Sequence, residues 1–145
     1  MDIRQVELAT DELVAAFQRL IPQLSPALEP PTQEELAAIV ASPATILFIA
    51  RDPERRDEIV GALTLVLYRI PSGVHARIED VVVDADARGK GIGKALMAAA
   101  IERATSAGAA GIDLTSRPSR EAANDMYRNM GFVQRETNVY HYALR

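Results

Sequence analysis

IEDVVVDADARGKGIGKALM, residues 78–97, joins an apolar strand to a glycine-rich turn that opens a helix. The three consecutive valines near its start are β-branched, so they favour an extended backbone and predict a strand buried on both faces. A polar loop, 84–87, follows, and apolar residues then recur at helical spacing from Ile92 to Ala104. The glycines between Arg88 and Lys94 are therefore predicted at the N-terminus of a helix.

A helix N-terminus with this composition is suited to binding a phosphate group. Its first backbone N–H groups lack partners within the helix, and the helix dipole adds partial positive charge there. Glycine has no Cβ, so an anion can approach the backbone closely. The alternative is an ordinary loop that tightens into a helix.

The spacing of the motif separates several kinds of phosphate loop. A nucleoside triphosphatase loop requires Ser or Thr where Ala95 stands, and a dinucleotide fingerprint requires glycine where Lys94 stands. The pattern that fits is Arg-x-x-Gly-x-Gly, formed by Arg88, Gly91 and Gly93. It resembles the acetyl-coenzyme A (acetyl-CoA) loop of the GNAT superfamily of N-acetyltransferases.

A second stretch, LTSRPSREAANDMYRNMGF at 114–132, is similar to another signature of that superfamily, in which a helix with a tyrosine runs into a Gly-Phe strand. The resemblance covers nearly the whole chain. It implies an α/β (α+β) fold, with a central mixed, mostly antiparallel sheet flanked by helices, in a single domain of residues 1–145.

Composition excludes several other classes of protein. The chain has 145 residues, a formal net charge of −4 and no cysteine, which argues against a general nucleic-acid binder and excludes disulfides and thiol nucleophiles. His75 and His141 stand apart without neighbouring ligands, so we expect no metal site. No apolar run suits a signal peptide or a membrane span, so we expect a cytoplasmic protein with no membrane partner.

Capping residues and periodicity predict the remaining elements. In chain order they are an edge strand at 2–8, a helix capped by Thr10 and disrupted by Pro22 and Pro26, a short helix with a capping box of Thr32 and Glu35, a hairpin of strands at 44–50 and 59–70, a strand at Ile112 and Leu114, a helix capped by Ser119 and ended by Gly131, and further strands from Phe132 and around 140–142.

The resemblance implies transfer of an acetyl group from acetyl-CoA to a primary amine, with both substrates bound together and no covalent enzyme intermediate. It places the cofactor along the loop and the strand before it, where an N–H near Val82 would polarise the thioester carbonyl. The implied contacts are Val81, Val82, Val83, Arg88, Gly89, Lys90, Gly91, Ile92, Gly93 and Lys94, with Arg88 and Lys90 as supplementary cations.

An alkylammonium must lose a proton before it attacks, and Glu79 and Asp80 are the nearest candidate bases. Successive strand residues point to opposite faces, so only one of them would face the acceptor, and we prefer Glu79. Pairing of one carboxylate with Arg77 is the alternative. The surrounding motif is also similar to that of glucosamine-6-phosphate N-acetyltransferases, which suggests a small-molecule amine as the acceptor.

Tyr127 occupies the family's position for a residue that protonates or stabilises the departing thiolate. A core tyrosine is the other interpretation, and the two are compatible. Where the family commonly has a cofactor-binding asparagine, seven residues before this tyrosine, the chain has Arg120. Asn124 could supply the amide contact instead.

Two other functions share this fold. One is a non-catalytic module that binds acyl-CoA and signals its level, which the presence of Glu79 and Tyr127 disfavours. The other is a protein N-terminal or lysine acetyltransferase, which would need an open groove for a peptide. A homodimer is compatible with the fold, but the sequence fixes neither the oligomeric state nor the acceptor amine.

Overall fold

The computed structural model describes residues 1–145, which form two compact units. The first unit is Met1–Leu114 and the second is Thr115–Arg145. The single-domain organisation expected from the sequence stays a prediction.

The first unit is built on a five-stranded sheet in the order β1-β2-β3-β4-β5. Neighbouring strands are antiparallel except β4 and β5, which are parallel. The mixed, mostly antiparallel sheet confirms the predicted fold class. The strands are β1 (Asp2–Gln5), β2 (Thr45–Asp52), β3 (Glu58–Ile70), β4 (Gly73–Val83) and β5 (Ile112–Asp113).

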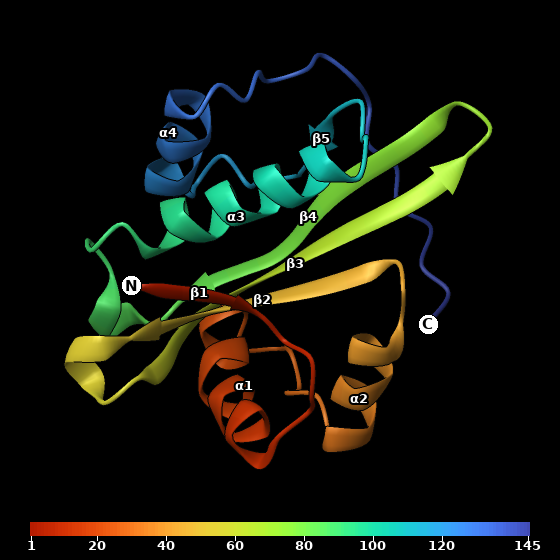
Figure 1. The fold of residues 1–145 in the computed structure, drawn as a ribbon. Coiled ribbons are helices and arrows are strands. Elements are labelled where there is room, and N and C mark those ends of the chain that lie inside the picture. The colour runs from red at the N-terminus through yellow and green to blue at the C-terminus, as the bar shows by residue number, and fades with distance from the viewer. The chain divides into compact units, whose positions relative to one another are not determined.

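Three helices flank this sheet: α1 (Asp11–Leu24) and α2 (Gln33–Ala41) cover one face, and α3 (Ile92–Ser106) covers the other (Figure 1). Both predicted caps are present, because Thr10 accepts the Leu13 N–H and Thr32 forms a capping box with Glu35. The predicted disruption at Pro22 is wrong, since α1 continues past it to Leu24. Only one helical N–H is lost so near the C-terminus, and Ser25 still donates to Ile21.

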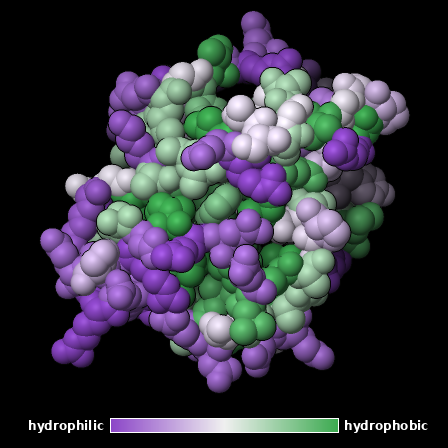
Figure 2. Space-filling view, viewed as in Figure 1, coloured by the Kyte–Doolittle hydropathy of each residue, from purple (hydrophilic) through white to green (hydrophobic).

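Hydrophobic side chains fill both sides of the sheet. Leu20 of α1 and Leu36 of α2 are almost fully buried on one side, as are Leu96 and Met97 of α3 on the other. Hydrophilic side chains dominate the surface over the β2–β3 turn, whereas hydrophobic side chains also reach the surface over α1 and α2 (Figure 2). No helix is both long and apolar enough to cross a bilayer.

Gly61 of β3 lies where Ile92 and Leu96 of α3 pack against the sheet. A Cβ at this position would lie 3.1 Å from Ile92 Cγ2, 3.2 Å from Leu96 Cδ1 and 3.2 Å from the Val82 carbonyl oxygen. We predict that Gly61→Val lowers the free energy of unfolding by about 1–3 kcal/mol through overpacking, measured by urea denaturation. Gly111→Val, where a Cβ meets nothing within 4 Å, is the control, and equal losses would contradict the explanation.

The second unit contains helix α4 (Glu121–Asn129). The helix ends shortly before Gly131, whose φ is positive, as the sequence predicts for a glycine that ends a helix. The predicted cap at Ser119 is wrong. A turn closed by the Arg120 N–H and the Arg117 carbonyl precedes the helix, so Arg120 takes the N-cap position and no side chain caps α4.

The strands predicted from Phe132 and around 140–142 are also wrong. Residues 132–145 form no regular secondary structure, and Val139, Tyr140, Tyr142 and Leu144 are exposed. Alternating apolar residues favour an extended backbone, but a strand exists only where another strand pairs with its backbone. This segment has the composition of a strand without the pairing.

Candidate functional site

The strand, loop and helix predicted from residues 78–97 are present in the first unit. β4 ends at Val83, a short 3₁₀ turn (η2, Ala85–Ala87) follows, and α3 begins at Ile92. Gly91 is the N-cap residue, and no side chain caps the helix. The first N–H groups of α3 are thus available to an external acceptor, which in a site of this kind is an anion.

Gly89 and Gly91 give the loop its conformation. Their φ angles are 84° and 77°, in a region that residues with a Cβ rarely adopt. A Cβ added at Gly91 would have no protein atom within 4 Å, so the surface beside the helix N-terminus is open. An uncapped helix start with an open surface fits a phosphate group.

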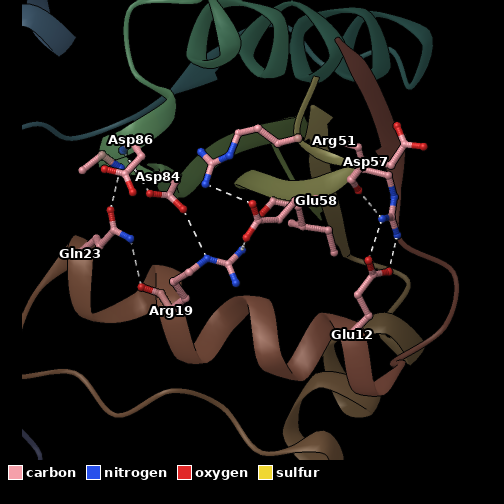
Figure 3. A network of polar contacts seen from close by, with 11 residues as sticks. Glu12, Arg19, Gln23, Arg51, Asp57, Glu58, Asp84 and Asp86 are labelled. Carbon is pink, nitrogen blue, oxygen red and sulfur yellow. Dashed lines mark hydrogen bonds and ion pairs between the residues drawn. The ribbon is translucent and has the colours of Figure 1, made fainter. Parts of the chain in front are cut away.

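Two residues of α1 hold the start of this loop (Figure 3). The Arg19 guanidinium donates to the buried Asp84 carboxylate at 3.3 Å, and the Gln23 side-chain oxygen accepts the Ala85 N–H at 2.8 Å. Asp84 also accepts the Asp86 N–H at 3.2 Å. Burial acts to raise the pKa of Asp84, but these hydrogen bonds outweigh it and the pKa is lowered.

The two predicted supplementary cations of the loop both have partners within the protein. Arg88 Nε donates to the Val83 carbonyl oxygen at 3.3 Å. Lys90 Nζ lies 3.2 Å from a carboxylate oxygen of Asp52, at the end of β2, and 3.9 Å from one of Glu54. Lys94, in the first turn of α3, is exposed.

β4 carries a bulge at Asp80 and Val81, where the run of valines begins. Ala62 of β3 pairs with Val82 and Thr64 pairs with Glu79, so Asp80 and Val81 together lie opposite a single residue of β3. Asp80 has a φ of 50°, in the left-handed region. The bulge interrupts the regular alternation of side chains on which the sequence-based choice between Glu79 and Asp80 relied.

One edge of β4 is largely unpaired along the valines. β5 pairs with β4 only at Ala76 and Arg77, so the strand from Ile78 to Val83 has no neighbour on that side. Backbone N–H and C=O groups there can bond to an extended ligand, as in strand addition. Val82 is buried, and Val81 and Val83 are half-buried.

The two acidic residues before the valines have different surroundings. Glu79 accepts from Arg77 Nε at 3.1 Å in an ion pair. Asp80 is exposed and makes no ion pair; partial desolvation by the surrounding protein and the negative charge of Glu79 raise its pKa above the ordinary value. Asp80 therefore remains protonated to a higher pH than a solvated aspartate.

In the second unit, α4 carries the remaining predicted residues. Tyr127 is 8% exposed, and its ring centroid lies 6.0 Å from that of Phe132. Burial raises the pKa of Tyr127, with the nearby positive charge of Arg120 acting in the opposite sense, so the hydroxyl stays neutral at neutral pH. The Asn124 amide donates to the carbonyls of Arg117 and Arg120, both at 2.9 Å.

Sequence patterns did not identify the residues that fix the loop. Arg19 and Asp84 are 65 positions apart, and Lys90 and Asp52 are 38 apart. Asp52 and Asp84 are the only buried charged residues, at 2% and 4% exposed, and each follows or ends an apolar strand. A single acidic residue at the end of such a strand was the one local signal. The structure contains no group of three His, Cys, Asp or Glu residues that could hold a metal ion.

Comparison with known sequences places this geometry in context. A sequence model of the acetyltransferase (GNAT) family matches residues 10–132. Glucosamine 6-phosphate N-acetyltransferase 1 of Oryza sativa subsp. japonica is 30% identical over 147 residues, which cover 94% of this chain and 84% of that protein. A probable glucosamine 6-phosphate N-acetyltransferase 2 from the same plant is 33% identical over 144 residues, covering 93% and 83%.

Solved structures show the same fold. A putative acetyltransferase from Agrobacterium tumefaciens superposes with a TM-score of 0.84 at 24% identity, covering 99% of this chain and 100% of that one. An aminoglycoside acetyltransferase from an uncultured soil metagenomic sample, in complex with sisomicin, gives a TM-score of 0.83 at 21% identity, covering 99% and 96%. A Trypanosoma brucei acetyltransferase gives 0.78 at 28% identity, covering 98% and 99%.

Proposed function

Because this chain belongs to the acetyltransferase (GNAT) family, we propose that it transfers the acetyl group of acetyl-CoA to the primary amine of a small molecule. The observation that carries the proposal is the uncapped N-terminus of α3, which follows the partly unpaired strand β4 through a glycine loop. These two features offer N–H groups for a pyrophosphate and backbone groups for an extended amide chain. Acetyl-CoA has both chemical parts.

In this proposal the pyrophosphate accepts from the N–H groups of the loop between Arg88 and Gly93, including Gly89, Lys90, Gly91 and Ile92. The exposed Lys94 side chain adds positive charge beside it. The pantetheine arm bonds to the free edge of β4 at Val81, Val82 and Val83. An N–H near Val82 then polarises the thioester carbonyl. We keep Arg120 and Asn124 as proposed contacts of the cofactor arm.

We assign the proton acceptor to Asp80 in preference to Glu79. The ion pair with Arg77 occupies the Glu79 carboxylate, whereas Asp80 has no ion-pair partner, and partial desolvation of its carboxyl raises its pKa. A base is most effective when its pKa approaches the working pH. Asp80 takes the proton of the ammonium group, directly or through water, and leaves a neutral amine.

The neutral amine nitrogen attacks the thioester carbonyl carbon and forms the new C–N bond. Collapse of the tetrahedral intermediate breaks the C–S bond and releases a thiolate, to which Tyr127 donates its proton. The raised pKa of Tyr127 supports this role, because the hydroxyl still carries its proton at neutral pH.

We predict that Asp80→Asn lowers kcat/KM by about tenfold, since a water chain can replace part of the base's function, whereas Glu79→Gln changes it by less than about twofold. In the wild type, kcat/KM should fall as the pH drops through a pKa above that of an ordinary aspartate, and this limb should be missing in Asp80→Asn. Measurement of kcat/KM from pH 4 to 9, a range of about five units around ordinary carboxyl values, checks this.

A loss of activity in Asp80→Asn should not result from a loss of folding stability. A raised pKa means that ionised Asp80 costs stability, and the cost grows as the pH rises through the range between the ordinary and the raised pKa. Asn cannot ionise and tolerates the left-handed conformation of position 80. Asp80→Asn should therefore melt no lower than the wild type at neutral pH. Equal losses of activity in the two variants would contradict the assignment to Asp80.

The proposed activity is tested by thiol release from acetyl-CoA with a panel of amines. Amino sugars come first, because two relatives are named for glucosamine 6-phosphate and a structural neighbour was solved with an aminoglycoside. Polyamines, amino acids and peptides follow. Saturable release with a small amine supports the proposal; release with peptides alone indicates a protein acetyltransferase, and tight acetyl-CoA binding without release indicates a sensor.

A further inference from the structure

Asp52, the last residue of β2, is buried, and each of its carboxylate oxygens accepts a hydrogen bond. It is 2% exposed. Its Oδ1 accepts the N–H of Glu54 in the short 3₁₀ turn η1 (Pro53–Arg55) at 3.0 Å, and its Oδ2 accepts from Lys90 at 3.2 Å. Asp52 thus links the end of β2 to the middle of the glycine loop.

The two side chains of the Asp52–Lys90 ion pair differ in their exposure to solvent. Lys90 is 40% exposed along its side chain and could find another anion or water, whereas the Asp52 side chain is 3% exposed. Burial acts to raise the pKa of Asp52, but the hydrogen bonds from Glu54 and Lys90, together with the charges of Lys90 and Arg55, lower it below the ordinary value. Lys90 is therefore one of the groups that stabilise the ionised form of Asp52 in this buried position.

A lysine in this arrangement is poorly suited to bind a phosphate as well. Moving the ammonium toward a ligand would remove the one cation that is hydrogen-bonded to the buried Asp52 carboxylate, which is unfavourable. Staying in place leaves the ammonium largely neutralised by Asp52. The useful effect of the pair is mechanical, because it fixes the loop between Gly89 and Gly91 in the conformation that presents the N-terminus of α3.

We infer that Asp52 and Lys90 form a positioning pair, which holds the glycine loop in its anion-binding shape, and that Lys90 promotes cofactor binding through this pair instead of through contact with a phosphate. The inference rests on the proposed function, since it concerns the same loop. It gives Asp52, which the sequence did not suggest, a role in cofactor affinity.

The decisive variants are Asp52→Asn, Lys90→Met and the two combined. Binding of coenzyme A is measured by calorimetry, and KM and kcat by thiol release. For a positioning pair, each single variant raises the Kd for coenzyme A by about tenfold. The Kd of the double variant is no higher than that of the single variant with the higher Kd. KM for acetyl-CoA follows the Kd, while kcat changes by less than about twofold.

Direct contact between Lys90 and a phosphate predicts the opposite for Asp52→Asn. That variant would free the ammonium, so the Kd would stay equal or fall while Lys90→Met still raised it. This outcome would overturn the inference. Asp2→Asn and Arg4→Met, which break an exposed ion pair on β1, are matched controls and should leave the Kd unchanged.

A second measurement does not depend on Asp52→Asn folding. Loss of a direct charge contact with a phosphate would make coenzyme A binding by Lys90→Met less sensitive to salt, whereas loss of a positioning pair leaves the salt dependence as in the wild type. A flattened salt dependence overturns the inference. Wild-type protein that fails to bind coenzyme A would overturn the proposed function as well, so the two failures are distinguishable.

Discussion

Gly91→Val is expected to raise the Kd for coenzyme A and the KM for acetyl-CoA by about 100-fold, which corresponds to roughly 2.7 kcal/mol. Gly91 has a φ of 77°, and a β-branched residue in the left-handed region costs about 1–2 kcal/mol. The loop can relieve this strain only by leaving its conformation, which turns the first N–H groups of α3 away from the ligand. The valine methyl groups also occupy the open surface where the proposed pyrophosphate would lie.

Gly108→Val is the matched control for this prediction. Gly108, just after α3, has a φ of 78°, and a Cβ there also meets nothing within 4 Å. Both variants therefore place a β-branched residue at a similar positive φ, and thermal unfolding should show similar losses of stability. Only Gly91→Val should lose affinity for coenzyme A in calorimetry; an equal loss in both would mean that general strain, and not the loop, is responsible.

Tyr127→Phe is expected to lower kcat by about 100-fold with little change in the KM for acetyl-CoA. The substitution removes only the hydroxyl, which we propose protonates the departing thiolate. The ring remains, so its packing 6.0 Å from Phe132 should be kept and the melting temperature should change little. Because the pKa of Tyr127 is raised, the wild type should keep this contribution through neutral pH and lose it only above the ordinary tyrosine range.

The measurement is thiol release at saturating acetyl-CoA, with Tyr140→Phe as the control. Tyr140 is 87% exposed, so loss of its hydroxyl should leave kcat unchanged. A wild-type kcat in Tyr127→Phe would remove Tyr127 from the mechanism and leave it as a buried packing residue. A fall confined to the KM would instead indicate a role in binding the cofactor.

Local signals predicted most of the first unit. The capping box of Thr32 and Glu35, the hairpin around 51–58 and the glycines at 89–93 each act over a few residues, and the structure contains the elements that they predict. These features could be read from the sequence because a cap, a turn or a helix start is stabilised by neighbours along the chain. The fold class followed from the resemblance of two motifs, and of the element order, to the GNAT superfamily.

Local signals failed wherever a segment depends on a distant partner. The strands expected after Phe132 require pairing that 132–145 does not make, and the bulge that gives Asp80 its left-handed conformation arises from the register of β4 against β3. Regular alternation predicts that only one of Glu79 and Asp80 faces the acceptor, and from the sequence we prefer Glu79 as the base. The bulge and the ion pair of Glu79 with Arg77 shift our proposal to Asp80.

The sequence by itself determined the glycine loop, the helix that it opens, the order of the elements from β1 to α4 and the tyrosine on that last helix. Only the tertiary structure decided which charges act on the loop. It buries Asp52 and Asp84 and brings Lys90 and Arg19 to them from 38 and 65 positions away. A buried carboxylate needs a cation, and a linear pattern cannot say which one folding will bring within reach.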